Sequence, residues 1–348
     1  MKKVKSKVLL LILLTIIILF FILKDDFNGI LSALLSANPI YLILIFLVII
    51  LAEFIKGIAL YIIIKNNKKN YKFKSAFSLA IKTNFFNGIT PFSLGGQPFE
   101  LYTLKKNDNI DYVTGTNILF KDFYAYQIAL VLLATIFLII NYIFNIVAFD
   151  SVLSKLMLVG YLVNLAVALF LIYLPYTKGN MHKITSFFIG ILSRLKIIKN
   201  KDKSIEKMDA SIDKFKMQIN DLKTNKKMII KCILLYMLRF IPLGLATTLS
   251  FYAVDVYSVG FVKPIIIMLL IMTMAAFVPI PGASGGMEYG FIAMFSFIPS
   301  NTLKASMLLW RFATYYLLLI MGAVLIMFEK RKWDCENRTI FGSIQAIC

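Results

Sequence analysis

The chain has 348 residues, of which 59% are hydrophobic, and its mean hydropathy is +0.80. This composition excludes an ordinary soluble domain, and the apolar residues come in runs of bilayer length, which indicates an integral membrane protein. The formal net charge is +20, but the Lys and Arg lie mainly in loops beside these runs, where they set orientation and meet anionic lipid. We therefore expect no nucleic acid partner.

The first apolar run, residues 8–23, follows a cluster of lysines at the N-terminus. It is long for the apolar part of a signal peptide and no A-x-A site follows it, so we expect a retained anchor helix. Further spans are predicted at 39–64, 112–142, 152–175, 228–254 and 305–328, which gives about six spanning helices.

Assigning the short basic loops to the cytoplasm gives one consistent path, with both termini cytoplasmic. On this path residues 75–104 begin and end on one face, and residues 264–298 begin and end on the other. We predict two re-entrant hairpins, broken at Pro91 to Pro98 and at Pro279 to Gly286. The alternative is that each hairpin is a single tilted span, which would reverse the orientation of everything after it.

The predicted fold is an all-α polytopic membrane protein whose halves form an inverted repeat, each half being helix, helix, broken hairpin and helix. The first repeat covers 1–142; the second begins at 143–175 and continues at 228–330. Between these parts, residues 176–227 form a basic cytoplasmic loop with an amphipathic helix that starts near Ile205. Residues 331–348 form a cytoplasmic tail. The richness in Lys, Asn and Ile favours a bacterial cell membrane.

The breaks share the pattern P, three residues, G, G: PFSLGG at Pro91 to Gly96 and PGASGG at Pro281 to Gly286. Broken helices leave backbone amides unpaired, and a half-helix that starts there points its positive end at the same spot. The alternative is that the glycines only let helices cross closely. The pattern predicts a binding site for an anionic headgroup at Ser93, Gly95, Gly96, Ser284, Gly285 and Gly286, with Gln97, Glu100 and Glu288 available for a cationic moiety or a proton relay.

Charges inside apolar runs each cost roughly 2.5 to 3.5 kcal/mol at a helix centre, so they mark candidate functional residues. We expect Lys121 or Asp122, or both, to line the interior. Arg239 and Arg311 suit a phosphate, because the guanidinium is forked, or they snorkel to a headgroup. Glu53 and Lys56 lie three residues apart on one helix and are equally well explained as a structural pair.

The cysteines are far apart, and the single His182 has no neighbour that completes a metal site. We expect neither a metal nor another cofactor.

Three segments resemble the signatures of the lysylphosphatidylglycerol synthase/flippase transmembrane family: TPFSLGGQPFELYTLKK at Thr90 to Lys106, PIPGASGGMEYGF at Pro279 to Phe291 and LLWRFATYYLLLIMG at Leu308 to Gly322. The resemblance covers roughly residues 5 to 330. It implies a membrane region that flips an aminoacylated phospholipid between leaflets. In two-part members of this family, a separate cytosolic domain transfers lysine from tRNA to phosphatidylglycerol.

The chain ends at Cys348, soon after the last predicted helix, so we expect no transferase domain and lean against an enzyme. The resemblance favours a flippase for phosphatidylglycerol or its lysyl derivative, with a less anionic outer surface and resistance to cationic peptides as the consequence. The alternatives are phosphatidylglycerol lysyltransferase, alone or with a separately encoded catalytic subunit, and a transporter of a polyprenyl or glycolipid carrier. A homo-oligomer stays open.

Overall fold

The computed structural model describes residues 27–93, 95–146, 152–173, 221–222, 224–275, 278 and 280–329. In this part of the chain, every regular element is helical and five helices are long and apolar enough to cross a membrane. They are α3 (Pro39–Asn67), α6 (Tyr112–Phe144), α7 (Val152–Tyr173), α10 (Lys226–Tyr252) and α13 (Ser300–Arg311), which continues through the π-helical turn η4 (Phe312–Tyr316) to Glu329. Five of the six predicted spans are thus confirmed.

Three predicted segments lie outside the described residues. They are the anchor helix at 8–23, the tail at 331–348 and, apart from residues 221, 222 and 224–227, the basic loop with its amphipathic helix.

Two of the spans, α3 and α6, begin at polar side chains that cap them. Asn38 accepts a hydrogen bond from the N–H of Ile40 at 2.9 Å, and Pro39 takes the first helical position, where its missing N–H is not needed. Asp111 accepts from the N–H groups of Val113 and Thr114 at the start of α6. These caps fix where the spans start, independently of the apolar runs that follow.

The first predicted hairpin consists of α4 (Phe73–Gly88), the short turn η1 (Pro91–Ser93) and α5 (Gly96–Asp108). The ammonium of Lys68, just after α3, donates to the carbonyl of Asp108 at the end of α5. The chain therefore enters and leaves this hairpin at the same end of α3.

The second hairpin consists of α11 (Lys263–Ala275), the short turn η3 (Pro281–Ala283) and α12 (Gly286–Met294). The Lys263 ammonium at the start of α11 lies 4.5 Å from the ring centroid of Phe297, which follows α12. This hairpin also enters and leaves on one side.

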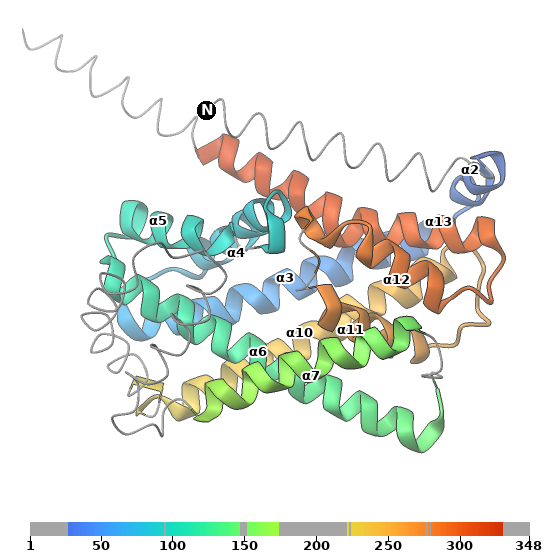
Figure 1. Ribbon diagram of the computed structural model, residues 1–348. Helices are drawn as coiled ribbons and strands as arrows, with labels where there is room; N and C mark the ends of the chain where they lie inside the picture. The colour runs from blue at the N-terminus through green and yellow to red at the C-terminus, as the bar shows by residue number, and fades with distance from the viewer. Residues whose placement is uncertain are drawn as a thin grey trace, which may run out of the picture.

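The two hairpins enter from opposite ends of the bundle. The N–H of Asn38, at the start of α3, donates to the carbonyl of Ala253 at the end of α10 at 2.8 Å, so these two packed helices run antiparallel. Figure 1 shows α4 and α5 at one end, α11 and α12 at the other, and α13 running along both. The turns η1 and η3 pack against each other where the tips meet.

The two breaks have the same backbone conformation at matched positions. After Pro91, Phe92 and Ser93 both have φ 54°; after Pro281, Gly282 and Ala283 have φ 63° and 52°. Left-handed backbone at non-glycine residues is uncommon, and its recurrence at corresponding places supports a structural repeat.

Candidate functional site

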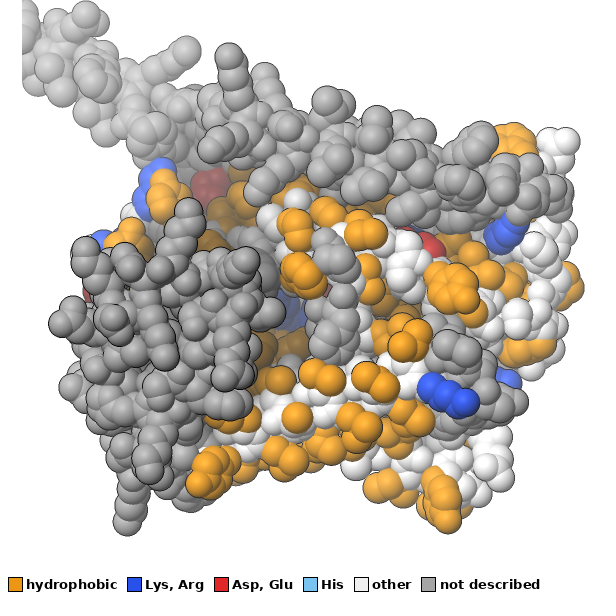
Figure 2. Space-filling model, in the orientation of Figure 1, with side chains coloured by type: hydrophobic (Ala, Val, Ile, Leu, Met, Phe, Trp, Pro, Cys, Tyr) orange, Lys and Arg blue, Asp and Glu red, His pale blue; other side chains and the backbone are white. Residues whose placement is uncertain are grey.

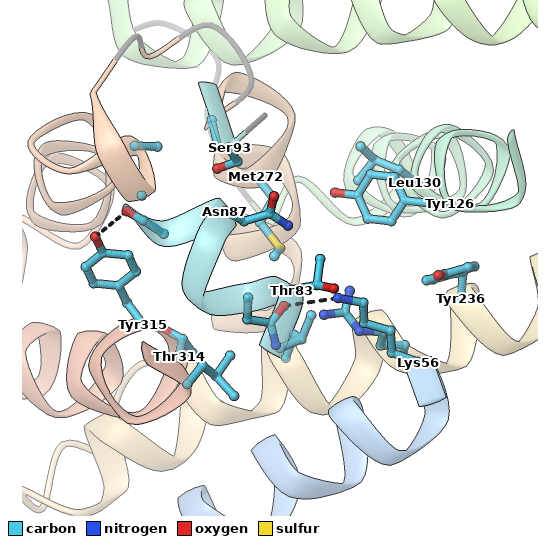
Figure 3. Close-up of a pocket in the computed structure, with 18 of the residues that line it drawn as sticks. Lys56, Thr83, Asn87, Ser93, Tyr126, Leu130, Tyr236, Met272, Thr314 and Tyr315 are labelled. Atoms are coloured by element: carbon cyan, nitrogen blue, oxygen red, sulfur yellow. Dashed lines mark hydrogen bonds between the residues drawn. The ribbon is translucent and has the colours of Figure 1, made fainter. Parts of the chain in front are cut away.

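A cavity of about 570 Å³ lies where the two tips meet, and α3, α6, α10 and α13 complete its wall. In Figure 2, Lys or Arg atoms are visible deep in a gap in the surface, and hydrophobic side chains lie above and below it. Figure 3 shows Lys56, Tyr126 and Tyr236 on one side of the cavity and Thr314 and Tyr315 on the other. The cavity therefore combines polar groups from both repeats with an apolar surround.

Six of the predicted site residues line this cavity: Ser93, Gln97, Glu100, Asp122, Arg239 and Arg311. Six more lie at the hairpin tips but do not line the cavity: Gly95, Gly96, Ser284, Gly285, Gly286 and Glu288. Lys121 lies elsewhere. Their role in binding a substrate stays a prediction.

Arg311 ties α13 to the tip of the second hairpin. Its Nε donates to Glu288 Oε1 at 2.7 Å, and one amino group donates to the carbonyl of Gly282 at 2.7 Å and to Ser284 Oγ at 3.1 Å. The other oxygen of Glu288 accepts from the N–H of Gly285 at 2.7 Å. Arg311 and Glu288 are only 5% and 4% exposed. One guanidinium thus holds the second break in shape while it also lines the cavity.

Side chains of the same hairpin hold the first break. The N–H of Gly95 donates to Thr90 Oγ1 and the N–H of Gly96 donates to Asn87 Oδ1, both at 2.8 Å. A Cβ at Gly96 would lie 2.3 Å from that Asn87 oxygen, so the close approach requires glycine. Together with Gly285, these amides are already hydrogen-bonded within the chain. In this conformation, these three of the donors that the sequence offered to an anionic headgroup are occupied.

A buried polar network joins α3, α4 and α10 beside the tips. An amino group of Arg239 donates to Glu53 Oε1 at 2.9 Å, and the Asn84 amide donates to Glu53 Oε2 at 2.7 Å. Lys56 donates to Asn84 Oδ1 at 3.0 Å. Glu53 therefore pairs with Arg239 of the second repeat, and Asn84 lies between Glu53 and Lys56.

Arg239 has one donor that no described residue accepts from. Its Nε is buried and has no hydrogen-bond partner within the described part of the chain, and the residue lines the cavity. Buried donors are nearly always satisfied in proteins. This orphaned N–H therefore favours an acceptor that is not among the described residues.

The carboxylates of Glu100 and Asp122 reach the same cavity from α5 and α6. Asp122 accepts a hydrogen bond from the hydroxyl of Tyr236 on α10. Neither carboxylate forms an ion pair with a residue that the structure describes. They offer the cavity two carboxyl groups beside the donors of Arg239 and Lys56.

Lys121 is fully buried, and its ammonium pairs with the carboxylate of Asp221 just before α10, which also accepts from the Asn117 amide at 2.9 Å. This position is outside the cavity wall. This contact attaches the residues just before α10 to α6.

We expect Asp221→Asn to lower the free energy of unfolding by about 3 kcal/mol, because it leaves the Lys121 ammonium buried without its counter-ion. Lys121→Met/Asp221→Asn is expected to recover most of that stability, since an apolar side chain then replaces the charge. Unfolding in detergent, followed by circular dichroism, measures both. If Lys121 bound substrate instead, Lys121→Met would leave stability unchanged and reduce transport.

Several polar residues at the site carry no signal in the sequence. Asn84, Asn87, Tyr236 and Tyr315 are uncharged, so a scan for charges in apolar runs passes over them. Only their placement at the meeting point of the hairpins distinguishes them. Asn84 and Asn87 lie three residues apart, so they share one face of α4 before the first break.

The fold and the cavity define a multi-pass α-helical membrane protein with a charged internal site between two inverted halves. The chain belongs to the family described as the lysylphosphatidylglycerol synthase TM region, whose model matches residues 8–322. No curated protein and no solved structure matches the chain significantly.

Proposed function

We propose that this protein is a flippase that moves an anionic or aminoacylated phospholipid, phosphatidylglycerol or its lysyl derivative, between membrane leaflets. Its family relates it to lysylphosphatidylglycerol synthesis and flipping. The inverted arrangement of two broken hairpins supports the proposal, because transporters bind their substrates where such repeats meet.

The observation that carries the proposal is the composition of the cavity wall. The buried Nε of Arg239, from which no described residue accepts, can donate to a phosphate oxygen, and Glu100 and Asp122 suit the ammonium groups of an aminoacyl headgroup. Leu119, Leu130, Leu243, Met268 and Met272 line the same cavity and suit acyl chains. A phospholipid presents this combination of phosphate, headgroup and hydrocarbon.

The proposed setting is a bacterial cell membrane with both termini in the cytoplasm. On this orientation the first hairpin opens from the cytoplasm and the second from outside. Labelling single cysteines in the loops after α3 and after α10 with a membrane-impermeant reagent in intact cells tests it. The loop at 253–262 would react and the loop at 68–72 would not.

Translocation is tested in proteoliposomes that contain phosphatidylglycerol and a trace of phosphatidylglycerol labelled with a fluorophore on an acyl chain. Dithionite bleaches label in the outer leaflet alone. We expect the purified protein to make inner-leaflet label bleachable, whereas protein-free vesicles keep it protected. If the fraction of label that dithionite bleaches is no larger than in protein-free vesicles, the proposal is refuted.

Competition identifies the cargo. Unlabelled lysyl-phosphatidylglycerol should slow bleaching if the aminoacylated lipid is the preferred cargo, and a polyprenyl phosphate should do so if the protein carries a glycolipid precursor instead. Lysyl-lipid formed by the purified chain from charged tRNA and phosphatidylglycerol would establish the lysyltransferase alternative.

A further inference from the structure

The last span, α13, contacts both hairpins. Before the π-turn η4, it packs on the second hairpin. The Trp310 ring stacks on Phe291 of α12 with centroids 5.3 Å apart, and Arg311 binds the carbonyl of Gly282. This half of α13 therefore belongs with the tip from its own repeat.

After the π-turn, the same helix packs on the first hairpin. A Cβ at Gly322 would lie 2.7 Å from Cβ of Phe85 and 3.0 Å from the Ile81 carbonyl, which shows how closely α13 approaches α4. Farther on, Glu329 pairs with Lys82 of α4 at 2.7 Å. The second half of α13 is thus attached to the other repeat, as its course along both hairpins in Figure 1 shows.

Tyr315, within the π-turn, touches both tips at once. Its hydroxyl donates to the carbonyl of Gly88, the last residue of α4, at 2.9 Å, the dashed line at the left of Figure 3. Its ring covers Gly282: a Cβ there would lie 2.2 Å from Tyr315 Cε2. The Arg311 guanidinium lies 4.3 Å from the centroid of the same ring. One side chain therefore joins the two breaks.

The π-turn places Tyr315 between the two tips. The N–H of Leu317 donates to the carbonyl of Phe312, five residues back, so the turn contains one more residue than an α-helical turn. Such turns occur frequently at functional sites and are places where helices bend. In α13 the turn falls between the half attached to one hairpin and the half attached to the other.

We propose that η4 is the hinge between the two hairpins and that Tyr315 is the latch that keeps their tips together. The conformation described is the latched one, in which the tips wall the cavity. Bending at the π-turn separates Tyr315 from Gly88 and opens that wall. Tyr315 is a positioning residue in this scheme, and the inference rests on the proposed translocation for its role in transport.

Tip separation is measured by electron spin resonance between spin labels on α5 and α12. Tyr102→Cys and Tyr289→Cys provide the sites, because these side chains are 54% and 65% exposed; Cys232, Cys335 and Cys348 are replaced by Ser. Tyr315→Phe removes one neutral hydrogen bond, so we expect the ratio of separated to joined tips to rise about two- to tenfold. An unchanged distance distribution in Tyr315→Phe would overturn the proposal.

Tyr316→Phe is the matched control, because it removes the neighbouring hydroxyl and leaves the contacts of Tyr315 with Gly88 and Gly282 in place. It should keep the parental distances. Deletion of Thr314 removes the extra residue of the turn and with it the placement of Tyr315 between the tips. We therefore expect the separated population to rise, as in Tyr315→Phe, and translocation to fall while helical content is retained. A deletion variant that keeps the parental distance distribution would refute the role of the turn, whatever the result for Tyr315→Phe.

The flipping assay separates the two proposals. Wild-type protein that fails to flip lipid, with Tyr315→Phe still altering the tip distances, would refute the proposed function and leave the latch. Wild-type protein that flips lipid, with Tyr315→Phe changing neither distance nor rate, would refute the latch and leave the flippase.

Discussion

Arg311→Ala is expected to slow lipid translocation about 10- to 100-fold. The substitution removes hydrogen bonds from the guanidinium to Glu288, to Ser284 and to the Gly282 carbonyl. The net loss of even one bond to a charged group, about 1.5 to 3 kcal/mol, shifts the equilibrium between the formed and the unformed tip roughly 10- to 100-fold. Because Glu288 would stay buried without its counter-ion, the tip should lose its shape. The rate of dithionite bleaching in proteoliposomes measures the effect.

Arg311→Lys tests whether charge alone suffices. A single ammonium lacks the planar fork that reaches Glu288 and the Gly282 carbonyl together, so we expect it to restore only a small part of the rate. Glu288→Gln, which keeps an oxygen for Arg311 and removes the charge, should be milder than Arg311→Ala. Wild-type translocation by Arg311→Ala would mean that neither the tip nor this guanidinium matters for transport.

Arg239→Met should have the largest effect on stability. It leaves the carboxylate of Glu53, which is 0% exposed, without its ion-pair partner. Breaking a buried pair from one side costs about 3 to 5 kcal/mol. Asn84 still donates to Glu53, but a neutral amide cannot balance the charge. Unfolding in mixed detergent, followed by circular dichroism, measures the loss.

The double variant Glu53→Met/Arg239→Met separates folding from function. Apolar replacement of both members of a buried pair is often neutral or stabilising, so most of the stability should return. Translocation should not return, because the Nε donor of Arg239 is absent. A double variant that is stable and flips lipid at the wild-type rate would show that the pair serves the fold alone.

The positions of the breaks were predictable because proline and paired glycine stop a helix wherever they occur. The motifs at Pro91 and Pro281 therefore marked both tips, and the apolar runs marked the five described spans. The positions of the basic loops predicted that both hairpins are re-entrant. The contact of Lys68 with Asp108 joins the two ends of the first hairpin, and that of Lys263 with Phe297 joins the two ends of the second, as the prediction requires.

Side-chain partners were not predictable in the same way. Glu53 has a cation three residues away in the sequence, but its partner is Arg239, 186 residues on. Lys121 and Asp122 are adjacent, and one pairs with Asp221 while the other binds Tyr236 at the cavity. The side chains of adjacent helical residues point about 100° apart. Tertiary packing alone therefore selects which of the two side chains points into the cavity.

The sequence by itself determined that the protein is a helical membrane protein with two matched breaks, because hydropathy, charge bias and helix-stopping residues are local properties of the chain. Only the tertiary structure decided what the breaks do. It satisfies the amides of Gly95, Gly96 and Gly285 within the chain, and it lets Tyr315 join the tips. It also leaves the Nε of Arg239 without a partner among the described residues. These outcomes depend on which segments, distant in sequence, approach within hydrogen-bond distance. The last span brings Tyr315 to both tips because it packs on α12 before the π-turn and on α4 after it.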